Sequence, residues 1–111
     1  MPSIRIETGT WLRGREHDLM LAVSEATFGP LGVRAEQNDV VINCRDAETR
    51  LIGPGKSERF CRIEIKMCAG RSDDQKRSLR ANISQPLAPF GIPDSDVKMI
   101  VTDVPGANLG H

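Results

Sequence analysis

The chain has 111 residues, 39% of them apolar, and its 15 Lys and Arg residues balance 15 Asp and Glu residues, so the formal net charge is zero. This length suits a single domain, and the lack of a basic excess argues against a nucleic-acid groove. No apolar run approaches the ~20 residues of a membrane span, and the first residues lack the pattern of a signal peptide. We therefore expect a cytoplasmic protein that binds neither nucleic acid nor a membrane.

The first part of the chain predicts a strand, a helix and a second strand. Residues 3–8 alternate and include β-branched side chains, as a strand does. Apolar residues at helical spacing predict a helix over 12–28, with Thr10 as its candidate N-cap and Gly29-Pro30 as its stop. Residues 40–42 form a short apolar run typical of a buried strand.

The second part repeats this order. After a hairpin or loop at 45–59, residues 60–68 alternate as a strand. Ser72 and Gln75 have the spacing of a capping box, which predicts the start of a helix. Pro86 is expected to end or kink that helix, and a strand over 97–101 follows. The tail at 103–111 is expected to add a short edge strand or to lie on a neighbouring subunit.

A short internal repeat supports a duplicated unit. The segment IRIE at 4–7 recurs as CRIE at 61–64, which is 57 positions later. We therefore predict one α+β domain over 1–111, built from tandem β-α-β units at about 2–44 and 60–102. Parallel crossovers give a four-stranded or slightly larger sheet with two helices on one face.

The strand at 60–68 divides its side chains between two unlike faces. One face carries Cys61, Ile63, Ile65 and Met67, and the other carries Arg62, Glu64, Lys66 and Cys68. The charged face is either solvent-exposed or packed around the symmetry axis of an oligomer. Zero net charge also favours association.

Metal and cofactor chemistry have little support in the sequence. The cysteines Cys44, Cys61 and Cys68 have irregular spacing, and the histidines are His17 and the terminal His111. A tetrahedral metal site needs a tighter set of ligands. We expect free core thiols, no metal and no cofactor.

Pro2 is the candidate for catalytic chemistry. Removal of Met1 would leave a secondary amine at the start of a strand. An α-amino group titrates near pH ~7.7, and burial or nearby cations lower that value because they disfavour the charged form. The neutral amine is a general base, and the protonated amine is a general acid.

Three features together resemble the tautomerase superfamily, which includes 4-oxalocrotonate tautomerase, malonate semialdehyde decarboxylase and macrophage migration inhibitory factor. They are Pro2 at the head of a strand, the duplicated β-α-β plan and the segment GRSDDQK at 70–76. The resemblance implies a homotrimer with inward-facing sheets. It also implies cofactor-independent enol–keto isomerisation of a small carboxylate-bearing substrate.

The resemblance also implies roles for individual residues. Pro2 matches the family's catalytic proline, and Arg71 matches an arginine that binds a substrate carboxylate. Lys98 or Arg34 would stabilise the developing oxyanion. Asp39 lies near an aspartate that orients substrate or water in the decarboxylase branch, although a cap at a strand entry explains it equally well.

Several branch-specific residues of the superfamily are absent, so alternatives stay open. One is a decarboxylase or hydratase of a 3-oxo acid, in which Pro2 is cationic and acts as an acid. A second is a non-enzymatic trimeric binding protein on the same scaffold. A third is a ferredoxin-like regulatory domain, which also uses split β-α-β units.

Overall fold

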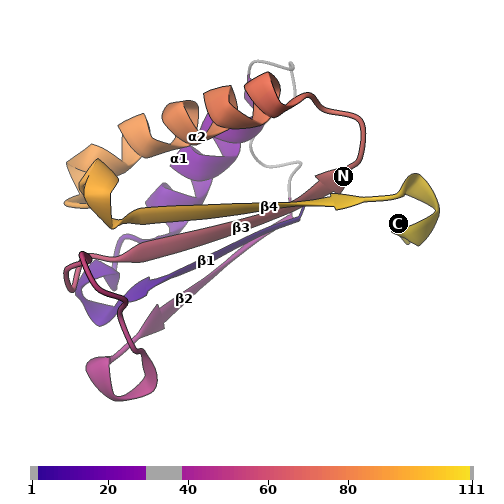
Figure 1. The fold of residues 1–111 in the computed structure, drawn as a ribbon. Helices are drawn as coiled ribbons and strands as arrows, with labels where there is room; N and C mark the ends of the chain where they lie inside the picture. The colour runs from indigo at the N-terminus through magenta and orange to yellow at the C-terminus, as the bar shows by residue number, and fades with distance from the viewer. Residues whose placement is uncertain (1–2, 30–38, 111) are drawn as a thin grey trace.

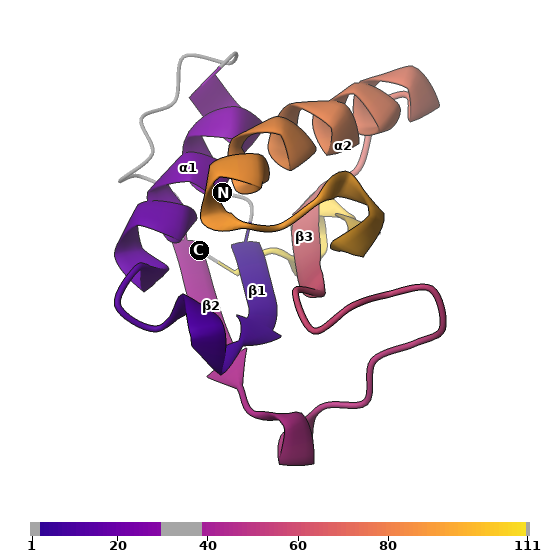
Figure 2. The same cartoon turned by 90° about the vertical axis from the view of Figure 1, so that its left-hand side faces the viewer.

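The structure, a computed structural model, describes residues 3–29 and 39–110 as a sheet covered on one side by helices (Figure 1). Its helices and strands are β1 (Ser3–Gly9), α1 (Glu16–Phe28), β2 (Asp39–Arg45), β3 (Cys61–Cys68), α2 (Asp73–Leu87) and β4 (Val97–Val104). Both helices lie on the same face of the sheet (Figures 1 and 2). The predicted α+β fold is confirmed.

The strand order is β2-β1-β3-β4. β1 runs parallel to β2, and β3 runs parallel to β4, whereas β1 and β3 are antiparallel. Each parallel pair is joined by one helix, as the predicted tandem β-α-β units require. The chain between β2 and β3 is a loop and not a hairpin, because β1 separates the two strands.

The register defines two ends of the sheet. At one end Ser3 pairs with Asp39 on β2 and with Lys66 on β3. We call this the Ser3 end; there β1 and β2 begin, and β3 and β4 finish. At the opposite end, the Gly9 end, β1 and β2 finish while β3 and β4 begin.

The core lies between the sheet and the helices. Side chains that alternate along β1 and β3 point toward the helices and have no exposed surface; they include Ile4, Ile6, Ile63 and Ile65. They pack in one cluster with residues of both helices, including Leu19, Val23, Ile83 and Leu87. Burying such a side chain stabilises the fold by roughly 1.5–3 kcal/mol.

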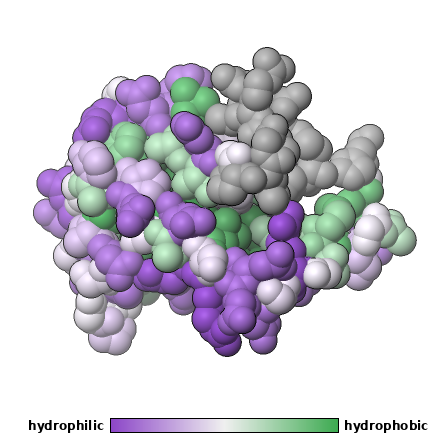
Figure 3. All heavy atoms as spheres, turned by 90° about the horizontal axis from the view of Figure 1, so that it is seen from above, coloured by the Kyte–Doolittle hydropathy of each residue, from purple (hydrophilic) through white to green (hydrophobic). Residues whose placement is uncertain are grey.

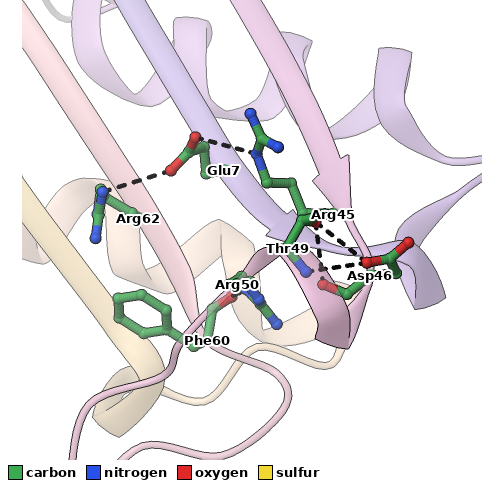
Figure 4. Close-up of polar contacts among 7 residues, drawn as sticks. All are labelled: Glu7, Arg45, Asp46, Thr49, Arg50, Phe60 and Arg62. Carbon is green, nitrogen blue, oxygen red and sulfur yellow. Dashed lines mark hydrogen bonds and ion pairs between the residues drawn. The ribbon is translucent and has the colours of Figure 1, made fainter.

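The other sheet face carries the alternating charges that the sequence predicted. There the Glu7 carboxylate lies between two arginines, 3.6 Å from Nε of Arg45 and 3.5 Å from Nη1 of Arg62 (Figure 4). Val41 and Ile100 are also exposed here, at 46% and 37%. This open face mixes ion pairs with apolar side chains at both edges.

Two details of the helices differ from prediction. α1 begins at Glu16, and Thr10 belongs to a separate 3₁₀ turn (Thr10–Leu12), so its assignment as N-cap is wrong. The reason is Gly14, whose φ of +95° suits glycine and interrupts the helix. α2 ends at Leu87, one residue after Pro86, as the proline predicted.

The cysteines are free thiols; Cys61 belongs to the core and Cys44 packs against it, but Cys68 does not. Cys61 is buried, Cys44 is half-buried and Cys68 is exposed on the open face, so the expectation of core thiols is wrong for Cys68. Alternation along β3 explains the difference, because positions 61 and 68 lie on opposite faces.

The end of the chain turns back in a 3₁₀ turn at Gly106–Asn108. Within the described residues 105–110 no strand follows β4, so the predicted edge strand is absent there. None of the helices described in residues 3–29 and 39–110 is long and apolar enough to span a membrane.

Candidate active site

A cavity of about 300 Å³ lies between the end of α1 and the first half of α2. Its described lining consists of Thr27, Phe28, Met67, Arg71, Asp74, Gln75, Ser78, Leu79 and Asn82. The helix face of the molecule exposes apolar atoms framed by polar ones (Figure 3). The cavity thus combines an apolar floor with a polar rim, as ligand sites commonly do.

Local sequence positions Arg71 at this cavity. The chain leaves β3 and turns at Gly70, whose φ of +122° is accessible to glycine. α2 then begins with the predicted capping box: the Ser72 hydroxyl accepts from the Gln75 amide at 3.2 Å, and the Gln75 side chain accepts from the Ser72 amide at 2.8 Å. Arg71 is therefore held between a glycine turn and a capped helix start.

Arg71 differs from its basic neighbours in having no carboxylate partner among the described residues. Along α2, Lys76 contacts Asp103 at 2.7 Å, Arg77 contacts Asp74 at 2.6 Å, and Arg80 contacts Asp94 at 2.8 Å. Arg71 is half-buried on the cavity wall. Its guanidinium is thus available for bidentate binding of a carboxylate.

The floor of the cavity is apolar. Phe28 and Met67 are each 2% exposed, and Leu79 packs against the same core. The Thr27 hydroxyl donates to the Val23 carbonyl at 2.7 Å, which satisfies it within α1. An apolar group of a ligand can therefore be buried here without loss of a hydrogen bond.

The cavity reaches the Ser3 end of the sheet. Met67 on its floor directly follows Lys66, the β3 partner of Ser3. The Ser3 hydroxyl donates to a carboxylate oxygen of Asp39 at 3.2 Å. The predicted site residue Asp39 thus lies at the same end of the sheet as Arg71, exposed at the entry of β2.

Lys98 is not brought to this site within one chain. It is in register with Arg62, near the Gly9 end, whereas the β4 partner of Lys66 is Thr102. Four residues of strand separate these positions by about 13 Å. Within one chain Lys98 therefore lies toward the opposite end of the sheet from Arg71, because β4 enters the sheet at the Gly9 end. Its role at the oxyanion stays a prediction.

The remaining predicted site residues, Pro2 and Arg34, lie outside the described residues. Sequence reasoning missed the cavity wall on α2, namely Ser78, Leu79 and Asn82. Spacings of three and four residues from Gln75 through Ser78 to Asn82 were the available signal, because such positions share one face of a helix.

No group of three or more His, Cys, Asp or Glu side chains within 3–29 and 39–110 is placed to hold a metal ion. The arrangement instead offers the Arg71 guanidinium, which has no carboxylate partner in the part of the chain that the structure describes, beside an apolar cavity. Its chemical capacity is to bind an organic anion.

Comparison with known proteins adds a family and a set of similar structures. A family model described as tautomerase enzyme matches residues 40–110. Curated protein sequences yield no significant match.

Three solved structures illustrate the similarity of fold. The FG41 malonate semialdehyde decarboxylase inhibited by 3-bromopropiolate is 25% identical, with a TM-score of 0.83 over 97% of this chain and 87% of that one. The F6 fused 4-OT asymmetric trimer is 23% identical, with a TM-score of 0.80 over 98% and 91%. N1, of the cis-3-chloroacrylic acid dehalogenase family, is 21% identical, with a TM-score of 0.81 over 98% and 79%.

Proposed function

The chain belongs to the tautomerase enzyme family, and from this premise we propose that it interconverts the enol and keto forms of a small carboxylate-bearing substrate without a cofactor. Pro2, made N-terminal by removal of Met1, is the proposed general base and acid. Arg71 is the proposed carboxylate-binding residue.

The observation that carries this proposal is that Arg71, which has no carboxylate partner within 3–29 and 39–110, lies on a cavity at the Ser3 end of the sheet. Pro2 is joined to Ser3 by one peptide bond, and consecutive Cα atoms lie ~3.8 Å apart. A substrate whose carboxylate binds Arg71 would therefore have its reacting carbon near the first residues of β1.

The proposed reaction moves one proton and leaves no other product. The neutral amine of Pro2 takes the proton from the enol oxygen, and the electron pair of that O–H bond forms the carbonyl. The electron pair of the carbon–carbon double bond takes the same proton back from the Pro2 ammonium, so that the proton ends on carbon 3 of the substrate. Arg34, or Lys98 from a second copy, would stabilise negative charge on the oxygen, and Asp39 would orient the substrate.

We further propose a cytoplasmic homotrimer. The similar fused 4-OT structure is described as a trimer, and a sheet face with exposed Val41 and Ile100 supports self-association. Three free thiols suit a reducing compartment. Light scattering after gel filtration gives the oligomeric state, and a monomeric mass would contradict the trimer.

The decisive assay is ketonisation of phenylenolpyruvate by the wild type and by Pro2→Ala. General acid–base catalysis contributes roughly 10²–10⁴-fold, so we expect a loss of that size in kcat/KM. Intact-mass measurement should show that Met1 is removed. Equal rates for both proteins would eliminate Pro2 as the base, and no turnover of any enol acid would favour the non-enzymatic binding protein.

Similarity to malonate semialdehyde decarboxylase favours one second candidate, a decarboxylase or hydratase of a 3-oxo acid. That chemistry requires a cationic Pro2 at neutral pH, whereas tautomerisation requires a neutral one. Titration of the ¹⁵N-labelled amine by NMR distinguishes the two reactions.

A further inference from the structure

We propose that the cavity beside Arg71 is a pocket for the substrate's tail, and that the substrate is an enol acid whose tail is neutral and largely apolar. This inference rests on the proposed function for its reaction but on the cavity for its substrate class. Ser78, Leu79 and Asn82 are the specificity-determining residues.

The size of the cavity exceeds what a carboxylate on Arg71 occupies. Its α2 wall runs from Asp74 to Asn82, which spans about 12 Å at ~1.5 Å per residue. A dry cavity of about 150 Å³ holds a benzene ring, so 300 Å³ accommodates an aryl or alkyl group together with the enol acid.

The described part of the wall offers no partner to a second carboxylate. Arg71 is the single cation in the described lining. The one acidic group there, Asp74, is 94% exposed and already contacts Arg77 at 2.6 Å. A carboxylate at the far end of the tail, beside Ser78 and Asn82, would lose water without gaining a cation from the described lining, which is unfavourable.

The far end of the wall is polar but uncharged. Ser78 and Asn82 are exposed on α2, and neither side chain makes a hydrogen bond to another described residue. Leu79 supplies apolar surface between them and is half-buried in the core. This order along the helix fits a tail that is apolar in the middle and tolerates one polar group at its tip.

The test compares a long and a short enol acid in variants that fill the pocket. The probes are phenylenolpyruvate and 2-hydroxy-2,4-pentadienoate, and the variants are Ser78→Phe and Asn82→Phe. We expect the ratio of kcat/KM for the long over the short probe to fall at least tenfold in both variants. Ala81→Phe is the matched control, since Ala81 is exposed on α2 but does not line the cavity; it should keep the wild-type ratio and activity.

A wild-type kcat/KM for the dicarboxylate 2-hydroxymuconate above that for phenylenolpyruvate would overturn the assignment of a neutral tail. An unchanged ratio in both pocket variants would overturn the pocket while leaving the tautomerase intact.

Binding of unreactive acids separates failure of the pocket from failure of the function. By isothermal titration calorimetry, 3-phenylpropanoate should bind the wild type at least tenfold more tightly than propanoate does, and Asn82→Phe should abolish the difference. If this holds while no enol acid is turned over, the proposed function fails and the tail pocket stands. Equal binding of the two acids by the wild type overturns the pocket.

Discussion

The two ends of the sheet use polar residues in opposite ways. At the Gly9 end Arg50 donates to the carbonyl oxygens of Phe60 and Glu58, at 2.5 Å and 2.7 Å (Arg50 and Phe60 are drawn in Figure 4). At the Ser3 end Arg71 borders a cavity and has no carboxylate partner among the described residues. Satisfied polar groups stabilise a fold, whereas a guanidinium without a carboxylate partner beside an apolar cavity can bind an anionic ligand.

Buried Asp96 strengthens the contrast. It is 3% exposed just before β4, and it accepts from the Ser57 amide at 2.6 Å and from the Ser57 hydroxyl. Lys56 also donates to the Ser95 carbonyl at 2.6 Å. These bonds fasten the loop between β2 and β3 to the start of β4. We therefore assign structural work to the Gly9 end and ligand binding to the Ser3 end.

The largest effect expected is a difference in thiol reactivity between Cys61 and Cys68. These residues lie at the two ends of β3, Cys61 at the Gly9 end and Cys68 at the Ser3 end. Burial raises the pKa of Cys61 to about 12, so its thiolate is roughly 10³-fold scarcer than that of an ordinary thiol at neutral pH. Iodoacetamide should therefore modify exposed Cys68 at least 10³-fold faster than Cys61, as followed by peptide mass spectrometry. Comparable rates would contradict the assignment of Cys61 to the core.

The same measurement reports on the open face. A Cys68 rate that rises on dilution would indicate that self-association covers it.

Since folding keeps Cys61 protonated while the unfolded thiol ionises near pH ~8.5, the free energy of unfolding should fall as pH rises from about 9 toward 12. Replacement by valine, Cys61→Val, should remove that dependence.

The next largest effect tests the Ser3 end. Arg71→Gln should lower kcat/KM for phenylenolpyruvate by about 10²-fold, because a charge-assisted bidentate pair is lost. Arg77→Gln is the control, since Arg77 lies near the start of α2 but is 73% exposed and pairs with Asp74. Its kcat/KM should change less than threefold. Equal losses in the two variants would show a general effect of positive charge.

The smallest effect tests the Gly9 end. Asp96→Ala should lower the free energy of unfolding by about 2 kcal/mol, because it leaves the Ser57 amide without its acceptor. The kcat/KM of the folded variant should stay within twofold of wild type. Urea unfolding measures the free energy of unfolding, and the ketonisation assay measures kcat/KM. A tenfold loss of kcat/KM under conditions where the variant is fully folded would contradict the division between the two ends.

Much of the fold was predictable because its signals are local. Alternation at 60–68 identified the buried and charged faces of β3, and the Ser72–Gln75 box identified the first turn of α2. Gly14 shows the limit of such signals. Apolar residues keep helical spacing over 12–28, but the positive φ of Gly14 interrupts the helical backbone. The helix α1 therefore begins at Glu16.

The candidate site was less predictable because its parts are distant in the chain. Thr27 and Phe28 line the same cavity as Leu79 and Asn82, which lie about fifty residues later in the chain, and no local pattern encodes that arrangement. Lys98 illustrates the same point, since only the register of β4 on β3 shows that it lies near the Gly9 end.

By itself the sequence determined the order of elements, the two faces of each strand and the resemblance to the tautomerase superfamily. The tertiary structure decided that Arg71 is left without a carboxylate partner among the described residues, and that a cavity lies beside it. The physical reason is that periodicity specifies which face of a helix or strand is buried. Pairing and hollows arise only when elements distant in sequence pack together.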